Sequence, residues 1–178
     1  MVASFGRYLD TLVLWNRRIN LTAIDDPMAI VERHFLDSLS VVPHVPADAT
    51  TLVDVGSGAG FPGAVIALLR PDLRVSLWEP NQKKVAFLRT IAHQLPLPNL
   101  TAEARRAEGA LPDAERFSVA VSRATLALPD WLRLGAGLVV PGGTILGMEG
   151  ADRHDLPPGA QRHHVSDDPR RAIIIYKP

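Results

Sequence analysis

The chain has 178 residues, a hydrophobic fraction of 47% and a formal net charge of zero. This length predicts one domain with a small addition, and the apolar content is enough for a packed core, which excludes wholesale disorder. The absence of cysteine excludes a disulfide framework, a thiolate zinc site and a cysteine nucleophile. No apolar run reaches the roughly 20 residues of a membrane helix, and the N-terminal segment has no signal-type apolar core. We therefore expect a protein of the cytoplasm with no membrane association.

Two amphipathic helices are predicted at the start of the chain. Apolar residues recur every three or four positions from Tyr8 to Ile19, so they share one helix face. A second stripe runs from Met28 to Leu39, behind Asp26-Pro27, which is typical of an N-cap followed by proline in the first turn. Residues 1–48 are expected to form a helical extension, and residues 49–178 the main domain as a single compact unit.

From residue 51 onward, short β-branched segments alternate with helical ones. Strands are expected at 51–55, 74–78, 100–104, 117–122, 144–148 and 171–176, and helices at 63–69, 81–95 and 128–138. This alternation predicts an α/β fold with a doubly wound parallel sheet and right-handed crossovers. Ligands of such sheets bind beyond the carboxyl ends of the strands, so residues that follow a strand are the candidates for a site.

The strongest local signal is the segment 54–63, D-V-G-S-G-A-G-F-P-G, between a strand and a helix. Glycine permits positive φ and lets a ligand approach the backbone closely. Two patterns fit: the dinucleotide fingerprint G-x-G-x-x-G over 58–63, and an acidic residue followed by G-x-G-x-G, as in S-adenosylmethionine sites. The strand end favours the second, because counting from Gly56 puts Phe61 where a dinucleotide site needs glycine. Asp54 would then face the ammonium group of the cofactor, directly or through water.

Glu79 closes the second strand, where a carboxylate can accept hydrogen bonds from both ribose hydroxyls. The alternative roles are a solvated surface residue and a partner for the helix that starts at Asn81. An acid at this position suits NAD as well as S-adenosylmethionine. A nicotinamide-dependent oxidoreductase on the same fold therefore stays open as an alternative function.

Several segments resemble the GidB/RsmG family of bacterial 16S rRNA methyltransferases. The resemblance covers about residues 8–150 and is most specific in R-H-F-L-D-S at 33–38 and in S-R-A at 122–124. The other matching segments are N-R-R-I-N-L-T at 16–22, the glycine segment, K-V-A-F-L at 84–88, R-A-E at 106–108 and P-G-G at 141–143. The resemblance implies a class I, Rossmann-like methyltransferase fold. It also implies methyl transfer from S-adenosylmethionine to N7 of a guanine in the 530 loop of 16S rRNA.

Together, the loop pattern and the resemblance give a set of expected cofactor-binding residues. They are Asp54, Gly56, Ser57, Gly58, Gly60, Phe61, Glu79, Ala107, Glu108 and Arg123. By the resemblance, Gly56 and Phe61 line the methionine and ribose, while Ala107 and Glu108 lie at the adenine. The same resemblance places Arg123 beside the transfer site.

Guanine N7 carries an in-plane lone pair, so it can attack a sulfonium methyl without first losing a proton. The reaction then needs positioning and electrostatics rather than a general base. Arg123 would orient the base through O6 or hold a phosphate, the alternative being an ion pair with Glu108. Arg33 and His34 would face the target nucleotide or the cofactor, the alternative being a helix-surface network with Asp37. Arg123, His34 and Arg33 are the expected catalytic residues.

The neutral net charge favours recognition of a shaped substrate over tight binding of any RNA. The expected partner is 16S rRNA within the small ribosomal subunit or an assembly intermediate, bound by a monomer. His154, His163 and His164 have no metal-site spacing, so we expect a solvated loop there and no metal. The region after Glu149 is shorter than the family pattern and the first helix starts late. An RNA-binding module with an inactive cofactor pocket is therefore the second alternative.

Overall fold

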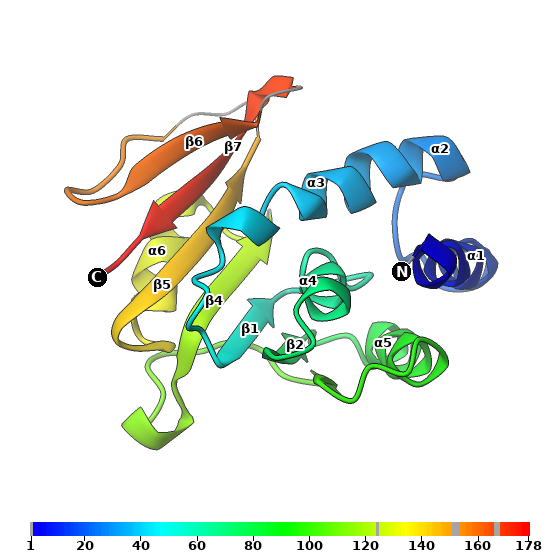
Figure 1. Cartoon of the computed structure of the whole chain (residues 1–178), viewed down its shortest axis with the longest axis horizontal. Coiled ribbons are helices and arrows are strands. Elements are labelled where there is room, and N and C mark those ends of the chain that lie inside the picture. The colour runs from blue at the N-terminus through cyan, green and yellow to red at the C-terminus, as the bar shows by residue number, and fades with distance from the viewer. Residues whose placement is uncertain (1, 124, 151–153, 166–167) are drawn as a thin grey trace.

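The computed structural model describes residues 2–123, 125–150, 154–165 and 168–178 (Figure 1). A seven-stranded sheet with the order β3-β2-β1-β4-β5-β7-β6 forms its centre. The strands are β1 (Thr51–Val55), β2 (Arg74–Trp78), β3 (Leu100–Glu103), β4 (Phe117–Arg123), β5 (Val139–Glu149), β6 (Gln161–Val165) and β7 (Asp168–Tyr176). The first five pair in parallel, and β7 is antiparallel to both β5 and β6. The order of strands reverses between β1 and β4, which is the switch point where ligands of such sheets bind.

Helices cover both faces of the sheet (Figure 1). The α-helices are α1 (Val2–Asn16), α2 (Pro27–Ile30), α3 (Asp37–Leu39), α4 (Gly63–Leu69), α5 (Gln82–Gln94) and α6 (Leu128–Ala136). A π-helical stretch, η1 (Val31–Leu36), joins α2 to α3, and two short 3₁₀ turns are η2 (Val42–His44) and η3 (Asp113–Glu115). Side chains from α1 to α5 pack in one hydrophobic core, and α6 packs in a second core on the opposite face. Among the described residues, no helix is both long and apolar enough to cross a membrane.

Local signals explain where several helices begin. The Asp26 carboxylate accepts a hydrogen bond from the Ala29 N–H at 2.7 Å, with Pro27 in the first turn of α2. Asn81 caps α5 in the same way by accepting from the Lys83 N–H at 2.9 Å. Such caps satisfy backbone donors that have no partner within the helix. Both helix starts confirm the expectation from the sequence.

Aromatic residues join the N-terminal helices to the sheet. The Phe35 ring lies edge-on to Tyr8 and to Phe61, with centroids 5.1 and 5.0 Å away. The Trp15 ring makes a similar contact with Phe87 of α5, at 5.7 Å. The helical segment therefore buries its apolar stripe in the same core as α4 and α5. The division at residue 48 stays a prediction.

The structure corrects two expectations about the C-terminal part of the chain. His163 and His164 lie exposed on β6, not in a loop. This strand pairs with β7 at the edge of the sheet and has no apolar alternation to reveal it, because most of its side chains face solvent. In addition, β5 starts at Val139 and includes the P-G-G segment, whereas the sequence predicted a strand only at 144–148. Residues 151–153 and 166–167 of the expected loop lie outside the described residues.

Candidate functional site

The glycine loop begins where β1 ends. The backbone N–H groups of Gly56 and Ser57 donate to the Trp78 carbonyl, at 2.8 and 3.2 Å, which fastens the loop to the end of β2. Gly56, Gly58 and Gly60 have φ of 71°, 55° and 94°. Residues with a side chain rarely adopt this conformation. The alternate glycines are therefore required by the path of the loop.

The three glycines differ in their surroundings. A side chain at Gly60 would collide with the Tyr8 hydroxyl, and one at Gly56 would collide with Thr125 Oγ1. At Gly58, an added Cβ would meet, within 4 Å and among the described residues, the Gly56 carbonyl oxygen alone, at 3.9 Å. The loop is packed on either side of Gly58 and open at Gly58 itself. This is the position where a ligand can approach the backbone.

Tyr8 couples α1 to the glycine loop. Its ring stacks on Phe61 with centroids 5.2 Å apart and an interplanar angle of 4°, and its hydroxyl donates to the Ala59 carbonyl at 2.6 Å. Burial, with a smaller contribution from Asp54, raises the pKa of Tyr8 well above its usual value, so the hydroxyl keeps its proton. The helical periodicity of the sequence identified Tyr8 as a core residue but carried no signal for this contact.

Asp54 is fully buried beneath the loop. Its Oδ2 accepts from the Gly63 N–H at 2.8 Å, while Oδ1 has no hydrogen-bond partner among the described residues. Burial raises the pKa of Asp54 to about 7, and the Gly63 N–H and Arg123 oppose that rise. The buried Ser57 hydroxyl is likewise without a partner in the described part of the chain. Buried polar atoms of this kind call for an explanation, and a ligand that supplies hydrogen bonds is one.

Glu79 lies at the end of β2 and is almost fully buried. Its Oε2 accepts from the Gly58 N–H at 3.0 Å, and Oε1 accepts from the Asn81 N–H at 2.9 Å. Glu79 therefore braces the open part of the glycine loop and supports the start of α5. Each carboxylate oxygen can accept a second hydrogen bond. Contact with ribose hydroxyls stays a prediction.

Arg123, at the end of β4, points to the face of the sheet that carries the N-terminal helices. Its Nη1 donates to the Arg33 carbonyl and to Asp37 Oδ2, both at 3.4 Å, and its guanidinium carbon lies 5.4 Å from the centre of the Phe61 ring. Asp37 Oδ1 accepts from Arg171 of β7 at 3.2 Å. One carboxylate thus joins three segments of the chain. The acid that pairs with Arg123 is Asp37, not the expected alternative Glu108.

The helix that carries the R-H-F-L-D-S segment explains this pairing. Residues 31–36 are π-helical, so the positions that meet on its surface differ from those of an α-helix. Among the described residues, the cations on the Asp37 carboxylate are Arg123 and Arg171, and the Arg33 side chain is exposed. The alternative of an Arg33–Asp37 pair on the helix surface is therefore wrong. Arg33 reaches Arg123 through its backbone carbonyl.

His34 lies beside Arg123 and the glycine loop. Its ring stacks on Phe61 at 5.1 Å, with an interplanar angle of 22°, and its Nε2 lies 2.8 Å from Thr22 Oγ1. Burial and the nearby Arg123 charge lower the pKa of His34 to about 4, so the ring is neutral at neutral pH. The structure thus brings His34, Arg123 and Phe61 together, whereas the Arg33 side chain points to solvent.

The residues expected at the adenine lie on the irregular segment between β3 and β4. Ala107 is half-buried against the core on the α6 face of the sheet, and Glu108 is exposed. On the same segment, the Arg105 guanidinium lies 4.0 Å above the ring of Trp78, the residue whose carbonyl holds the glycine loop. The roles of Ala107 and Glu108 stay predictions. Ala124, from the S-R-A segment, lies outside the described residues.

Comparison with known proteins identifies the family. The family model GidB, rRNA small subunit methyltransferase G, matches residues 1–167. The ribosomal RNA small subunit methyltransferase G of Anaeromyxobacter dehalogenans is 47% identical over 154 residues, which cover 84% of this chain and 70% of the relative. That of Xanthomonas oryzae is 41% identical over 182 residues, which cover 96% of this chain and 84% of the relative. Relatives of the same name are therefore similar across most of this chain.

Solved structures show the same fold at lower identity. The S-adenosylmethionine-dependent methyltransferase SibL, in its apo form, matches 81% of this chain and 55% of its own with a TM-score of 0.66 at 14% identity. A methyltransferase from Thiobacillus denitrificans, solved with S-adenosyl-L-homocysteine, matches 69% of this chain and 51% of its own, with a TM-score of 0.56 at 22% identity. These likenesses confirm the class I methyltransferase fold. The chain belongs to the GidB family of rRNA small subunit methyltransferases G.

Proposed function

We propose that this protein transfers a methyl group from S-adenosylmethionine to N7 of a guanine in the 530 loop of 16S rRNA. The observation that carries the proposal is the buried Asp54 beneath a glycine loop that is packed at Gly56 and Gly60 and open at Gly58. The relatives named above are methyltransferases of small-subunit rRNA, which supports the class of substrate. The choice of N7 and of the 530 loop comes from the family resemblance of the R-H-F-L-D-S and S-R-A segments.

The residues around the loop fit S-adenosylmethionine. Asp54 Oδ1 and Ser57 Oγ, without partners in the described residues, would take the ammonium group and a polar atom of the methionine part. Glu79, held at the open position by the Gly58 N–H, would accept from the ribose hydroxyls. Gly56, Gly60 and Phe61 would complete the cradle, with Ala107 and Glu108 at the adenine. When bound, the cofactor supplies an electrophilic methyl group on a sulfonium centre.

The residues near Arg123 suit a reaction that needs no proton transfer. Guanine N7 has a lone pair in the ring plane, so the protein has to position the base rather than deprotonate it. The neutral His34 ring stacks on Phe61, and its Nε2 lies at hydrogen-bonding distance from Thr22 Oγ1. These contacts suit a residue that holds the Phe61 ring in place. Arg123, held by Asp37 and the Arg33 carbonyl, would orient the base or a phosphate. The exposed Arg33 side chain would contact the RNA.

The proposal includes a setting for the reaction. A neutral protein has little bulk attraction for RNA, so we infer that it recognises 16S rRNA folded within the small ribosomal subunit or an assembly intermediate. It would act as a monomer in the cytoplasm. The two alternatives are a nicotinamide-dependent oxidoreductase and an RNA-binding module with an inactive pocket. Thermal stabilisation by S-adenosylhomocysteine but not by NAD(H) would exclude the oxidoreductase.

The direct test uses methyl-labelled S-adenosylmethionine with 16S rRNA and with small subunits that lack the modification. After digestion, chromatography should find the label in 7-methylguanosine, and Arg123→Ala should lose it. Arg133→Ala, which removes an exposed arginine of α6, is the matched control and should keep full activity. If cofactor binding is measured but no RNA form is labelled, the rRNA assignment is wrong and the inactive-pocket alternative gains support.

A further inference from the structure

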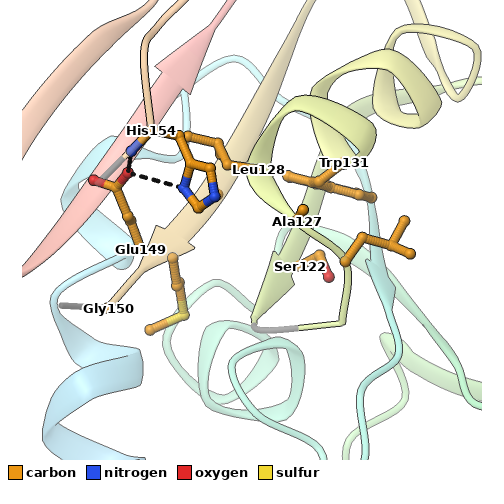
Figure 2. Close-up of a pocket in the computed structure, with 10 residues that line it drawn as sticks. Ser122, Ala127, Leu128, Trp131, Glu149, Gly150 and His154 are labelled. Atoms are coloured by element: carbon orange, nitrogen blue, oxygen red, sulfur yellow. Dashed lines mark hydrogen bonds and ion pairs between the residues drawn. The ribbon is translucent and has the colours of Figure 1, made fainter. Parts of the chain in front are cut away.

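A cavity of about 250 Å³ lies at the carboxyl ends of β4 and β5, next to the start of α6 (Figure 2). Leu128, Trp131 and Met148 form its apolar walls, and its polar lining comes from Ser122, Glu149 and His154. Figure 2 shows Leu128 and Trp131 on one side and Glu149 on the other, with the His154 ring between them. The cavity thus combines a broad apolar surface with a few polar groups, as small-molecule sites do.

Hydrogen bonds connect the wall of this cavity to the residue that precedes the glycine loop. The Ser122 hydroxyl, which lines the cavity, donates to the Val55 carbonyl at 2.9 Å. Thr125 Oγ1 donates to the same carbonyl at 3.2 Å. Val55 is the residue immediately before Gly56, and Arg123 follows Ser122 in β4. The cavity is therefore adjacent to the loop proposed to hold the cofactor. The Arg123 side chain points to the opposite face of the sheet, where it would hold a phosphate.

An ion pair between the buried Glu149 carboxylate and the partly exposed Arg162 builds the polar side of the cavity. The Glu149 carboxylate accepts from Arg162 Nε at 2.7 Å and from Nη2 at 3.0 Å, a bidentate pair between the end of β5 and β6. Glu149 Oε1 also accepts from the His154 N–H at 3.1 Å, and Arg162 Nη2 donates to the His154 carbonyl at 2.6 Å. Both backbone polar groups of His154 are thus held by one ion pair. Bidentate arginine–carboxylate pairs fix geometry as well as adding energy.

The His154 side chain extends from this arrangement and is partly exposed. Its Nδ1 lies 3.7 Å from Glu149 Oε1, and the side chain is 36% exposed while that of Glu149 is 2% exposed. Figure 2 shows the His154 ring between Glu149 and the Leu128 and Trp131 side chains of α6. A partly accessible imidazole whose backbone is held by hydrogen bonds can donate to or accept from a planar ligand in the cavity.

We propose that this cavity receives the acceptor base of the RNA and that His154 binds an edge of that base through Nε2; the inference rests on the proposed function. Enzymes that modify bases take them out of the stack and hold them between apolar or aromatic side chains, with hydrogen bonds to the base edges. Leu128, Trp131 and Met148 supply the apolar contact, and His154 supplies the hydrogen bond. The cavity is smaller than the roughly 300–1,000 Å³ of drug-sized sites, which suits one heterocycle.

Two substitutions test the cavity without altering the glycine loop. Ala127→Leu fills it from an exposed position at the start of α6, and His154→Ala removes the hydrogen-bonding ring. Both should bind S-adenosylhomocysteine as the parent does and melt at a similar temperature. Each should lose about tenfold or more in kcat/KM with small subunits, the effect of losing one good contact to a base. His164→Ala, an exposed histidine on β6, is the matched control and should be fully active.

A second readout does not depend on turnover. The Trp131 indole N–H donates to the Leu146 carbonyl at 3.0 Å, so its NMR resonance reports on the cavity wall. In the presence of S-adenosylhomocysteine, guanosine 5′-monophosphate should shift this resonance in the parent and in His164→Ala, and much less in Ala127→Leu. A shift without methylation of any RNA would support the cavity and overturn the proposed function.

Methylation without any effect of the cavity variants would overturn the cavity proposal and leave the proposed function standing. If the parent methylates RNA while Ala127→Leu and His154→Ala keep its turnover, and if guanosine 5′-monophosphate leaves the Trp131 resonance unmoved, the acceptor base binds elsewhere. Equal loss of activity in all three variants, the control included, would also overturn the inference, because it would show an effect of substitution that does not depend on the cavity. Loss in Ala127→Leu alone would keep the cavity and remove the role of His154.

Discussion

The carboxyl group of Asp54 holds its proton more tightly than an exposed carboxyl does. Burial raises its pKa to about 7, so the protonated form is populated near neutral pH. The pKa in the folded protein lies above that of the unfolded chain. The folding stability that comes from this group is therefore greatest at low pH and is lost as the pH rises toward 7. A cation beside Asp54 would favour the charged form and reverse this trend.

We expect cofactor binding to release a proton from Asp54. S-adenosylhomocysteine carries an ammonium group, which lowers the pKa of a neighbouring carboxyl, so binding at pH 7 should expel part of a proton per molecule. Calorimetry in buffers of different ionisation enthalpy measures that release directly. Asp54→Asn should bind more weakly and show no buffer dependence. The same binding enthalpy in every buffer for the parent protein would contradict the prediction.

The glycine loop was predictable because its chemistry is local. An acid, a strand end and alternate glycines lie within ten consecutive positions, 54–63. The Arg123–Asp37–Arg171 cluster was not predictable in the same way. Its partners are separated by 86 and 134 residues, and the π-helical stretch before Asp37 changes the helix register. The ligand chemistry of the glycine loop can be predicted from its own consecutive residues. An ion pair between distant segments can be identified only when the packing of those segments is known.

At the scale of whole elements, α1 supports the loop that it touches. Tyr8 is the contact: its ring lies flat on Phe61 and its hydroxyl satisfies the Ala59 carbonyl. Gly60 has no side chain because the Tyr8 hydroxyl occupies that space. The first helix of the chain therefore determines the shape of a loop more than fifty residues away, and α1 belongs to the site although it carries none of the expected site residues.

Tyr8→Phe tests this support. The substitution keeps the stacked ring but leaves the buried Ala59 carbonyl without its donor, which costs about 1–3 kcal/mol of unfolding free energy. We expect that loss in urea denaturation, together with weaker binding of S-adenosylhomocysteine, because the loop is no longer fixed. Tyr176→Phe on β7 is the matched control and should leave cofactor affinity unchanged. Unaltered affinity in Tyr8→Phe would mean that the loop keeps its shape without α1.

Strands and helices of this protein differ in how well they can be predicted from their sequences. β1, β2 and the cap of α2 have clear local signals, and the structure confirms them. β6 has none, since its side chains are exposed or half-buried and its pairing depends on β7. Edge strands that face solvent lack the alternation that identifies half-buried ones. The sequence therefore located β7 of the C-terminal hairpin, but its partner β6 could be located only from the three-dimensional structure.

At the scale of the whole molecule, the N-terminal helices and the sheet share one core. Tyr8 and Phe35 from the helical segment pack with Phe61 and Phe87 from the α/β part. A shared core of this kind links the unfolding of its parts. The helical segment is thus an extension in sequence that is integrated in packing.

We expect a single cooperative unfolding transition for residues 1–48 together with the rest of the chain. Far-UV circular dichroism follows all helices, and the fluorescence of Trp15, against Phe87, follows the helical segment in a variant with the other two tryptophans replaced by phenylalanine. The two signals should change at the same urea concentration. An earlier fluorescence transition would instead show that the first 48 residues unfold as a separate unit.

The position of β7 has a consequence for the order of events during synthesis. β7 lies between β5 and β6 in the sheet but follows β6 in the chain. During translation, β6 therefore emerges from the ribosome before its pairing partner has been synthesised. Asp37 likewise meets Arg171 across 134 residues of chain, a closure that comes late because long loops cost more entropy to close. The nascent protein can assemble its cofactor loop early, but the cluster around Arg123 is complete only after β7 has emerged. If the proposed function is right, this rRNA methyltransferase completes the cluster around Arg123 only near the end of its own synthesis on the ribosome.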